Sequence, residues 1–398
     1  MIFSRKASSI AESSTLAVTN KVKKMKAEGI DVIGFTVGEP DFDTPDNIKQ
    51  AAVDAISNGF TKYTAVAGTL ELREAIAKKL YDDNGITYTA NQIVVSNGAK
   101  HALANTFAAL LNDGDEVIIP APYWLSYPEM VKLAGGVPII VQTVADNGFK
   151  PTLAALEAAV TPKTKAIIIN SPSNPTGMLY TRDELAVIAK FAITNDIYVV
   201  SDEIYEKLTY DGLEHISIAS LGADIFERTI VVNGLSKSHA MTGWRVGYTA
   251  CCAPLASIIA NVQSHLASNV NSIAQAAALV AVTDSEDSVA AMCVQFEKRR
   301  NYIYERVLNI PHITALKPQG AFYVFVDISA FLGKTIHGVK ISTAQDLEML
   351  MLDKCNVAVV SCNDFGAPGC IRLSYAMSME VIEEGLNRIE AFVRGTGL

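Results

Sequence analysis

The sequence predicts an α/β fold in which a mostly parallel central sheet is covered by helices. Five short runs rich in β-branched residues alternate with helix-like stretches, at residues 92–95, 116–119, 166–170, 198–201 and 229–232. These runs are continuously apolar rather than alternating, which is typical of strands buried on both faces. Each run ends in small or polar residues, and ligands of such sheets bind at the carboxyl ends of the strands. We therefore expect these ends to converge on one site.

A length of 398 residues exceeds one ordinary hydrophobic core and predicts two units. After about Ser285 the pattern changes to a charged helical stretch, shorter strand-like runs at 320–326, 357–360 and 371–374, and an amphipathic close. Ile382, Leu386, Ile389 and Val393 mark one face of that last helix. We predict a large domain at 46–285, a small α/β domain at 286–398, and an N-terminal segment at 1–45 that packs with the small domain.

Composition excludes several classes of partner. The formal net charge is −9 and no long cluster of Lys or Arg occurs, which argues against nucleic acid or a membrane surface. Residues 1–15 lack the apolar core of a signal peptide, so we expect a cytoplasmic protein. The six cysteines form no C-x-x-C pair and have no nearby histidine at ligand spacing, so we predict reduced thiols and no metal site.

The run at 233–248 carries the strongest chemical signal. Ser236, Lys237 and Arg245 follow the strand at 229–232 and bring together a hydroxyl, an amine and a guanidinium. A phosphate monoester needs several donors at once, and a lysine amine forms an imine with an aldehyde. We interpret Lys237 as the lysine that binds pyridoxal phosphate.

A second phosphate contact is predicted where the strand at 92–95 meets the next helix. Gly98, Ala99 and Lys100 open a helix expected at 101–111, and free N–H groups at a helix start bind anions. The competing interpretation is a common strand-to-helix turn.

Asp202 ends the strand at 198–201 with a carboxylate that the covered sheet would bury. A protonated pyridine nitrogen would be its partner and would keep the cofactor ring an electron sink. Tyr205, three residues on, would hydrogen-bond a ring hydroxyl. The alternatives are a helix N-cap for Asp202 and core packing for Tyr205.

Two further residues follow strand ends and point to a ring. Asn174 lies in a loop fixed by two prolines, and its amide can donate to a ring oxygen. Trp124, one of two tryptophans, can stack on a ring, and core packing is its alternative.

Arg372 lies in an apolar strand, where it would clamp a substrate α-carboxylate or form a structural salt bridge.

Together these residues resemble a known family nearly from end to end. The chain is similar to class I aminotransferases of pyridoxal phosphate fold type I, in the bacterial aspartate aminotransferase-like branch. The motifs that carry this resemblance lie at 37–42, 62–64, 96–100, 122–124, 174–177, 201–205, 236–248, 320–323 and 372–374.

The resemblance implies an enzyme that moves an α-amino group between an L-amino acid and a 2-oxo acid such as 2-oxoglutarate. The implied mechanism is ping-pong through an aldimine at Lys237, the catalytic residue. The implied cofactor contacts are Gly98, Ala99, Lys100, Trp124, Asn174, Asp202, Tyr205, Ser236, Lys237 and Arg245. The implied substrate contacts are Gly38, Trp124, Asn174 and Arg372. Tyr63 would reach the cofactor phosphate of a partner subunit, which implies a homodimer with shared active sites.

The side chain that the enzyme accepts is open at this stage. Aspartate is the leading substrate by resemblance, yet no Lys or Arg occurs from His101 to Val131 to read a distal carboxylate. The neighbouring Ser13, Ser14 and Thr15 could hydrogen-bond a carboxylate but cannot neutralise it. Aromatic, alanine and prephenate-type substrates remain alternatives, as do a C–S β-lyase and a non-catalytic regulatory protein of the same fold.

Overall fold

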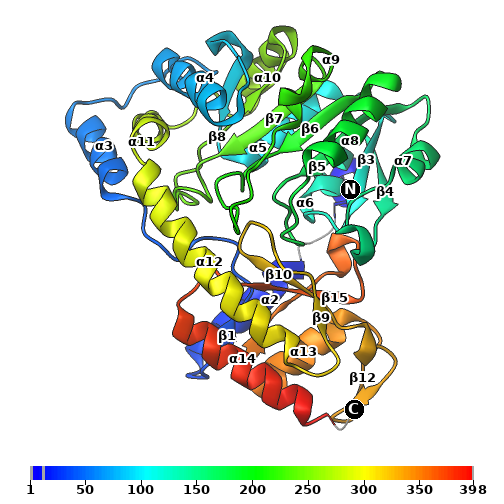
Figure 1. Cartoon of the computed structure of the whole chain (residues 1–398). Helices are drawn as coiled ribbons and strands as arrows, with labels where there is room; N and C mark the ends of the chain where they lie inside the picture. Colours follow the sequence, from blue (N-terminus) through cyan, green and yellow to red (C-terminus); the bar gives the residue numbers. More distant parts are fainter. Residues whose placement is uncertain (1–2, 11–13, 397–398) are drawn as a thin grey trace.

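The computed structural model describes residues 3–10 and 14–396 and contains two α/β units (Figure 1). The larger unit is built on a seven-stranded sheet in the order β2-β8-β7-β6-β5-β3-β4. Its strands are β2 (Ile93–Ser96), β3 (Glu116–Ala121), β4 (Val137–Gln142), β5 (Thr164–Asn170), β6 (Tyr198–Asp202), β7 (Thr229–Gly234) and β8 (Gly247–Ala250). Strand β8 is antiparallel to both of its neighbours, and the other neighbouring pairs are parallel. The prediction of a mostly parallel sheet is confirmed.

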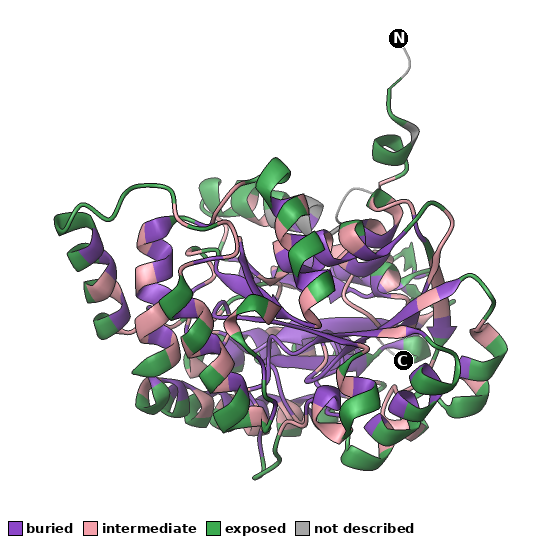
Figure 2. Cartoon of the chain, turned by 90° about the horizontal axis from the view of Figure 1, so that it is seen from above, coloured by how far each residue is buried: buried purple, intermediate pink, exposed green. Residues whose placement is uncertain are grey.

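Helices cover both faces of this sheet. They are α3 (Asp46–Ser57), α4 (Leu70–Asn84), α5 (Ala99–Leu110), α6 (Ser126–Leu133), α7 (Leu153–Ala159), α8 (Arg182–Thr194), α9 (Ala223–Phe226), α10 (Ala253–Leu266) and α11 (Ser272–Thr283). Successive residues of β3 enter different cores: Val117 and Ile119 pack with α5 and α10, and Ile118 packs with α8. Both faces are therefore buried, which explains why the strands are continuously apolar. Figure 2 shows the buried strands between helices that are exposed on their outer sides.

The smaller unit has a four-stranded sheet in the order β14-β15-β10-β9. Its strands are β9 (Thr314–Ala315), β10 (Tyr323–Asp327), β14 (Val360–Ser361) and β15 (Cys370–Ser374), and a hairpin joins β11 (Thr335–Ile336) to β12 (Val339–Lys340). Its helices are α12 (Glu286–Leu308), α13 (Ala344–Cys355) and α14 (Met379–Arg394). In Figure 1, α12 starts beside α11 and runs down to lie along α14.

The N-terminal segment contacts both units: its first helix lies against α6 of the larger unit, where Lys6 pairs with Asp113, and its later part contacts the smaller unit. It contains α1 (Arg5–Ser8), α2 (Ser14–Ala27) and β1 (Ile33–Gly34), and β1 pairs in parallel with β13 (Val357–Ala358). Lys21 forms an ion pair with Asp353 on α13 at 2.9 Å. Single turns of 3₁₀ helix occur at η1 (Ala90–Gln92), η2 (Ala145–Asn147), η3 (Ile218–Leu221), η4 (Ser329–Phe331) and η5 (Asn363–Phe365). The domain boundaries at 45/46 and 285/286 stay predictions.

Two strands of the large sheet were not predicted from the sequence. Strand β4 is an edge strand that contains Pro138, and β8 reads Gly-Tyr-Thr-Ala without a β-branched run. Their places are set by pairing with neighbours rather than by local preference. Among residues 3–10 and 14–396, no helix has the length and hydropathy needed to cross a membrane.

Candidate active site

A cavity of about 690 Å³ lies where the carboxyl ends of the large sheet's strands meet the smaller unit. Most of the predicted site residues line it together. They are Gly38, Ala99, Lys100, Trp124, Asn174, Asp202, Tyr205, Ser236, Lys237, Arg245 and Arg372. They come from segments more than 300 residues apart, so the expected convergence of strand ends is found.

Lys237 follows β7 and donates from Nζ to the carbonyl oxygen of Gly38 at 2.5 Å. Burial lowers the pKa of Lys237 to about 8, Glu39 opposes this shift, and Arg372 and Arg245 add to it. A lysine with this pKa has a substantial neutral fraction near neutral pH. The neutral amine is the form that attacks an aldehyde or removes a proton.

Asp202 is the last residue of β6 and is 3% exposed. Its Oδ2 accepts a hydrogen bond from the Tyr127 hydroxyl at 2.6 Å, and its Oδ1 accepts one from the Ile204 N–H at 3.2 Å. Burial raises the pKa of Asp202 to about 6, and the Tyr127 hydrogen bond acts against that shift. The residues after Asp202 form turns rather than a helix, so the N-cap interpretation does not apply. A buried carboxylate that faces a cavity is suited to a cationic ring nitrogen.

An anion-binding corner lies at the start of α5. Gly98 caps this helix with φ 84°, and a Cβ at Gly98 would lie 2.5 Å from Nη2 of Arg245. Only glycine therefore lets the guanidinium approach the helix start. Lys100 lies with Nζ 4.8 Å from the centre of the Trp124 ring, and its pKa is lowered by burial and then by Arg245. Neither Arg245 nor Lys100 forms an ion pair within the described part of the chain.

Arg372, on β15, is 5% exposed. Its Nη1 donates to Oδ1 of Asn174 at 2.9 Å and its Nη2 to the carbonyl of Thr36 at 3.2 Å, while Nε has no partner. The guanidinium lies 4.3 Å from the centre of the Tyr323 ring. None of the carboxylates that the structure describes pairs with Arg372, so the alternative of a structural salt bridge is not found. A buried guanidinium without an anion is a candidate receptor for one.

The remaining predicted ring contacts are also buried. The Tyr205 and Tyr323 hydroxyls are 3.0 Å apart, and Tyr205 is 3% exposed. The backbone N–H of Asn174 donates to Oδ1 of Asn170 at 2.7 Å, which fixes the loop. Trp124 is half-buried and both lines the cavity and packs edge-on against Tyr127.

Some predicted residues lie away from the cavity. Tyr63 is 89% exposed and points to no group that the structure describes, so its reach to a partner stays a prediction. Gly98 lies behind Arg245 rather than on the cavity wall. Ser13 lies outside the described residues, and so do the side chains of Ser14 and Thr15.

Sequence reasoning missed several residues of the cavity. Tyr127, Tyr323, Asn170 and Glu39 all line it or bond to its residues. Asn170 is a polar residue at the carboxyl end of β5, so the expectation that ligands bind at strand ends could have identified it. Tyr323 ends the motif at 320–323 but was assigned no role, and Tyr127 gave no signal, because nothing local distinguishes a cavity tyrosine from a core tyrosine.

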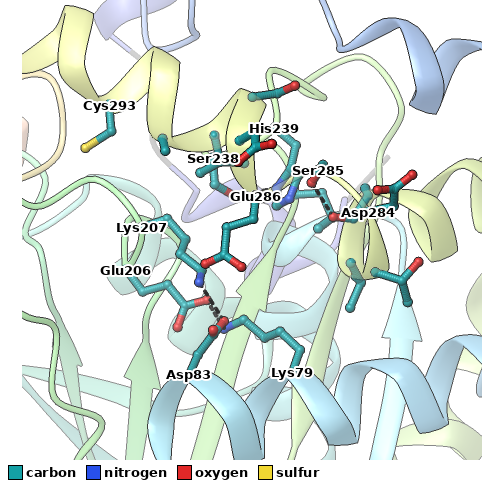
Figure 3. Close-up of a pocket in the computed structure, with 18 of the residues that line it drawn as sticks. Lys79, Asp83, Glu206, Lys207, Ser238, His239, Asp284, Ser285, Glu286 and Cys293 are labelled. Atoms are coloured by element: carbon teal, nitrogen blue, oxygen red, sulfur yellow. Dashed lines mark hydrogen bonds and ion pairs between the residues drawn. The ribbon is translucent and has the colours of Figure 1, made fainter.

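A second cavity, of about 890 Å³, is lined in part by residues that adjoin Lys237 in the chain, and Figure 3 shows Ser238 and His239 among them. Leu235, Ser238 and His239 line it, while Ser236 and Lys237 line the first cavity. Its lysines are paired: Lys79 bonds to Glu206, and Lys207 lies 2.8 Å from Asp83. Burial lowers the pKa of His239 to about 4.

Glu203, Glu206 and His215, which follow β6, bring ligand-type atoms within 4.8 Å of one another. Two of these groups already have partners in the protein, since Glu206 pairs with Lys79 and the hydroxyls of Ser201 and Ser217 donate to Oε1 of Glu203. The absence of a metal site thus stays a prediction.

Comparisons with known proteins define the class. The family described as aminotransferase class I and II matches residues 30–389, and the chain belongs to this family. The chain is 49% identical to an aspartate aminotransferase of a Bacillus species (strain YM-2), over 99% of each chain. It is 46% identical to a probable aspartate/prephenate aminotransferase of Aquifex aeolicus, over 96% of each. The crystal structure of the aspartate aminotransferase from Rhizobium meliloti superposes with a TM-score of 0.96, at 39% identity and 99% coverage of each chain. This protein is a transaminase that uses pyridoxal phosphate.

The residues of the cavity fit that cofactor. Arg245, Ser236 and the start of α5 would bind the cofactor phosphate. Lys237 would bind the cofactor aldehyde, and Asp202 would pair with the ring nitrogen. Lys237, Arg245, Arg372 and Asp202 all lack ionic partners among the described residues, and Arg372 and Asp202 are also buried, as groups that bind an oppositely charged ligand would be.

Proposed function

We propose that this enzyme transfers the amino group of L-aspartate to 2-oxoglutarate, with pyridoxal phosphate held at Lys237. The observation that carries the proposal is a single cavity with four cations that have no ionic partner: Lys100, Lys237, Arg245 and Arg372. A dicarboxylate substrate and a cofactor phosphate together bring the matching negative charges.

Each cation has a separate task in this proposal. Lys237 would hold the cofactor through its aldehyde, and its amine, once free, would take the substrate Cα proton and return it. The bound cofactor supplies an electron sink, and Asp202 favours the protonated ring. Arg245 and Ser236 bind the phosphate, with the start of α5. Asn174 and Tyr205 contact the ring oxygen, and Trp124 stacks on the ring.

Substrate carboxylates use the remaining two cations. Arg372 binds the α-carboxylate through its planar fork, and Gly38 lets the backbone approach the substrate closely. Lys100, predicted from the sequence as a contact of the cofactor phosphate, is assigned here instead to the distal carboxylate of aspartate, because Arg245 and Ser236 already serve the phosphate. Its Nζ lies over the Trp124 ring, where the substrate side chain would extend. Lys100 would thus supply the positive charge for the distal carboxylate, which the stretch from His101 to Val131 lacks because it contains no Lys or Arg.

Product analysis tests the proposal directly. Purified protein with aspartate and 2-oxoglutarate should yield oxaloacetate and glutamate in equal amounts, with no turnover beyond a single half-reaction per active site when either substrate is omitted. Alanine and phenylalanine serve as donors that lack a distal carboxylate. A C–S β-lyase would instead release ammonia and pyruvate from a thioether amino acid without a 2-oxo acid, and that outcome, with no amino transfer from aspartate, would refute the proposal.

Prephenate is a second candidate acceptor, favoured by the relative named as an aspartate/prephenate aminotransferase. Like the oxo acid of aspartate, prephenate carries a second carboxylate for Lys100. Conversion of prephenate by this enzyme with aspartate as donor would establish the activity, and rates at background level would exclude it.

We also propose a cytoplasmic homodimer in which Tyr63 completes the partner's phosphate site. Large apolar side chains are exposed on and beside α3, at Val53, Ile56, Phe60, Tyr63 and Leu70, which supports an interface there. All six cysteines are free thiols, in keeping with a reducing compartment. A solution mass near 42.7 kDa, that of one chain, would refute the dimer. If sites are shared, inactive Lys237→Ala and Tyr63→Ala chains should regain activity when they are unfolded, mixed and refolded together.

A further inference from the structure

Tyr127 connects two predicted contacts of the cofactor ring. It is the second residue of α6 and is 2% exposed. Its hydroxyl donates to Oδ2 of Asp202 at 2.6 Å, and its ring packs edge-on against Trp124 at 5.4 Å between ring centres. Its backbone N–H also donates to the Trp124 carbonyl at 3.0 Å. The Tyr127 side chain thus contacts both Asp202, the proposed partner of the cofactor ring nitrogen, and Trp124, which is proposed to stack on the ring.

The carboxylate of Asp202 has few other constraints. Its Oδ1 accepts only the longer bond from the Ile204 N–H, at 3.2 Å. The Asn170 amide donates to the Asp202 backbone carbonyl at 2.9 Å and leaves the carboxylate itself unbound. Removal of the Tyr127 hydroxyl would therefore free the carboxylate to rotate. It would also leave Oδ2 buried without a donor, which disfavours the charged form.

We propose that Tyr127 is a positioning residue that holds the Asp202 carboxylate charged and correctly turned toward the ring nitrogen of pyridoxal phosphate. This inference rests on the role proposed above for Asp202. A short hydrogen bond from a neutral phenol to a buried carboxylate is charge-assisted and stronger than an ordinary one. The phenol stays neutral because burial and the Asp202 charge raise the pKa of Tyr127 well above its usual value.

The other groups that face Asp202 do not duplicate this role. Glu203, next along the chain, disfavours the charge on Asp202 and so raises its pKa, whereas Lys237 favours that charge. Tyr205 bonds to Tyr323 and not to Asp202. Tyr127 is thus the one side chain among the described residues that hydrogen-bonds the Asp202 carboxylate.

Tyr127→Phe tests the inference because it removes the hydroxyl and keeps the ring against Trp124. Cofactor affinity, measured by equilibrium dialysis of cofactor-free protein, should fall about tenfold, the loss expected for a hydrogen bond to a charged group. The carboxyl carbon of Asp202, followed by ¹³C NMR in cofactor-free protein, should titrate at a higher pH than in the wild type. In the loaded enzyme kcat should fall while the KM for aspartate stays within about twofold, because Arg372 is untouched.

Tyr210→Phe is the matched control. Tyr210 is 1% exposed, and its hydroxyl bonds to the Ala321 carbonyl outside the cavity. This variant should lose stability without any change in cofactor affinity or in the Asp202 titration. If Tyr127→Phe and the wild type have the same cofactor affinity and the same Asp202 titration, the inference about Tyr127 is wrong, while the proposed function stands. Wild-type protein that binds no cofactor would overturn the proposed function instead.

Discussion

The two cavities lined by residues around Lys237 differ in how their charges are balanced. The cavity without Lys237 is the larger one, yet its Lys79 and Lys207 are paired with Glu206 and Asp83. In the smaller cavity, Lys237 and Arg372 have no ionic partner among the described residues. The two cavities are lined by neighbouring residues of the chain: residues 236–237 line the smaller cavity and residues 238–239 line the larger one.

If the smaller cavity is the active site, as proposed, unbalanced charge identifies the functional cavity better than size does. Ion pairing satisfies the buried and half-buried charges of the larger cavity within the protein itself. In the smaller cavity the cost of burying cations is met only when an anion binds there. Substitutions of matched residues in the two cavities should therefore have very different effects on catalysis.

The largest contrast is expected between two lysines. Lys237→Ala should lower kcat by more than about 10³-fold, because it removes both the nucleophile and the proton-transfer group. Lys207→Ala, in the other cavity, should change kcat less than twofold and cost at most about 1 kcal/mol of stability. Steady-state rates with aspartate and 2-oxoglutarate measure the first, and denaturant unfolding the second. Similar kinetic losses in both variants would break the comparison.

Arg372→Lys should have the next largest effect. The substitution keeps the positive charge but loses the planar fork that binds a carboxylate through two hydrogen bonds. We expect kcat/KM for aspartate to fall about 100-fold, mostly through KM. Arg306→Lys is the control, since Arg306 pairs with Glu390 between α12 and α14. An unchanged KM in Arg372→Lys would argue against the α-carboxylate role.

Lys100→Met should change specificity rather than overall activity. Loss of a hydrogen bond to a charged group predicts a fall of about tenfold in kcat/KM for aspartate. The same parameter for alanine should change less than twofold, because alanine has no distal carboxylate. An equal loss for both donors, with weaker cofactor binding, would instead assign Lys100 to the cofactor phosphate.

The smallest effect concerns pH. With a pKa of about 8, Lys237 is neutral in about a tenth of molecules at pH 7 and in half at pH 8. The rate at which cofactor-free protein captures pyridoxal phosphate should rise about fivefold between these values and less than twofold from pH 8 to 9. Asp202, with a pKa of about 6, is charged throughout this range. Stopped-flow absorbance measures the capture, and a rate that keeps climbing to pH 10 would contradict the lowered pKa of Lys237.

Much of the site was predictable because its chemistry is local. Lys237, Asp202 and Arg372 stand out as polar residues at strand ends or in an apolar strand, where burial demands a partner. Tyr127 could not be predicted in the same way. Its importance depends on the distance between α6 and the end of β6, which only the packed fold sets. For the same reason β8 was missed, since pairing with β2 and β7 rather than its own residues makes it a strand.

The fold also suggests a role for Lys100 that differs from the cofactor phosphate contact predicted from the sequence. The printed residues place Lys100 beside the predicted phosphate turn, and nothing in that turn tells which anion it meets. In the folded chain, Nζ of Lys100 lies over the Trp124 ring. Lys79 and Lys207, in contrast, each form an ion pair with a carboxylate. Long-range geometry was needed for this step.

Chemical trapping of the cofactor tests the central claim most directly. Protein loaded with pyridoxal phosphate is treated with borohydride, digested, and mapped by mass spectrometry to find the lysine that carries the label. The account predicts one label for each chain, at Lys237, and none at Lys79 or Lys207. A label on the lysines of the larger cavity, or no stoichiometric label at all, would contradict it.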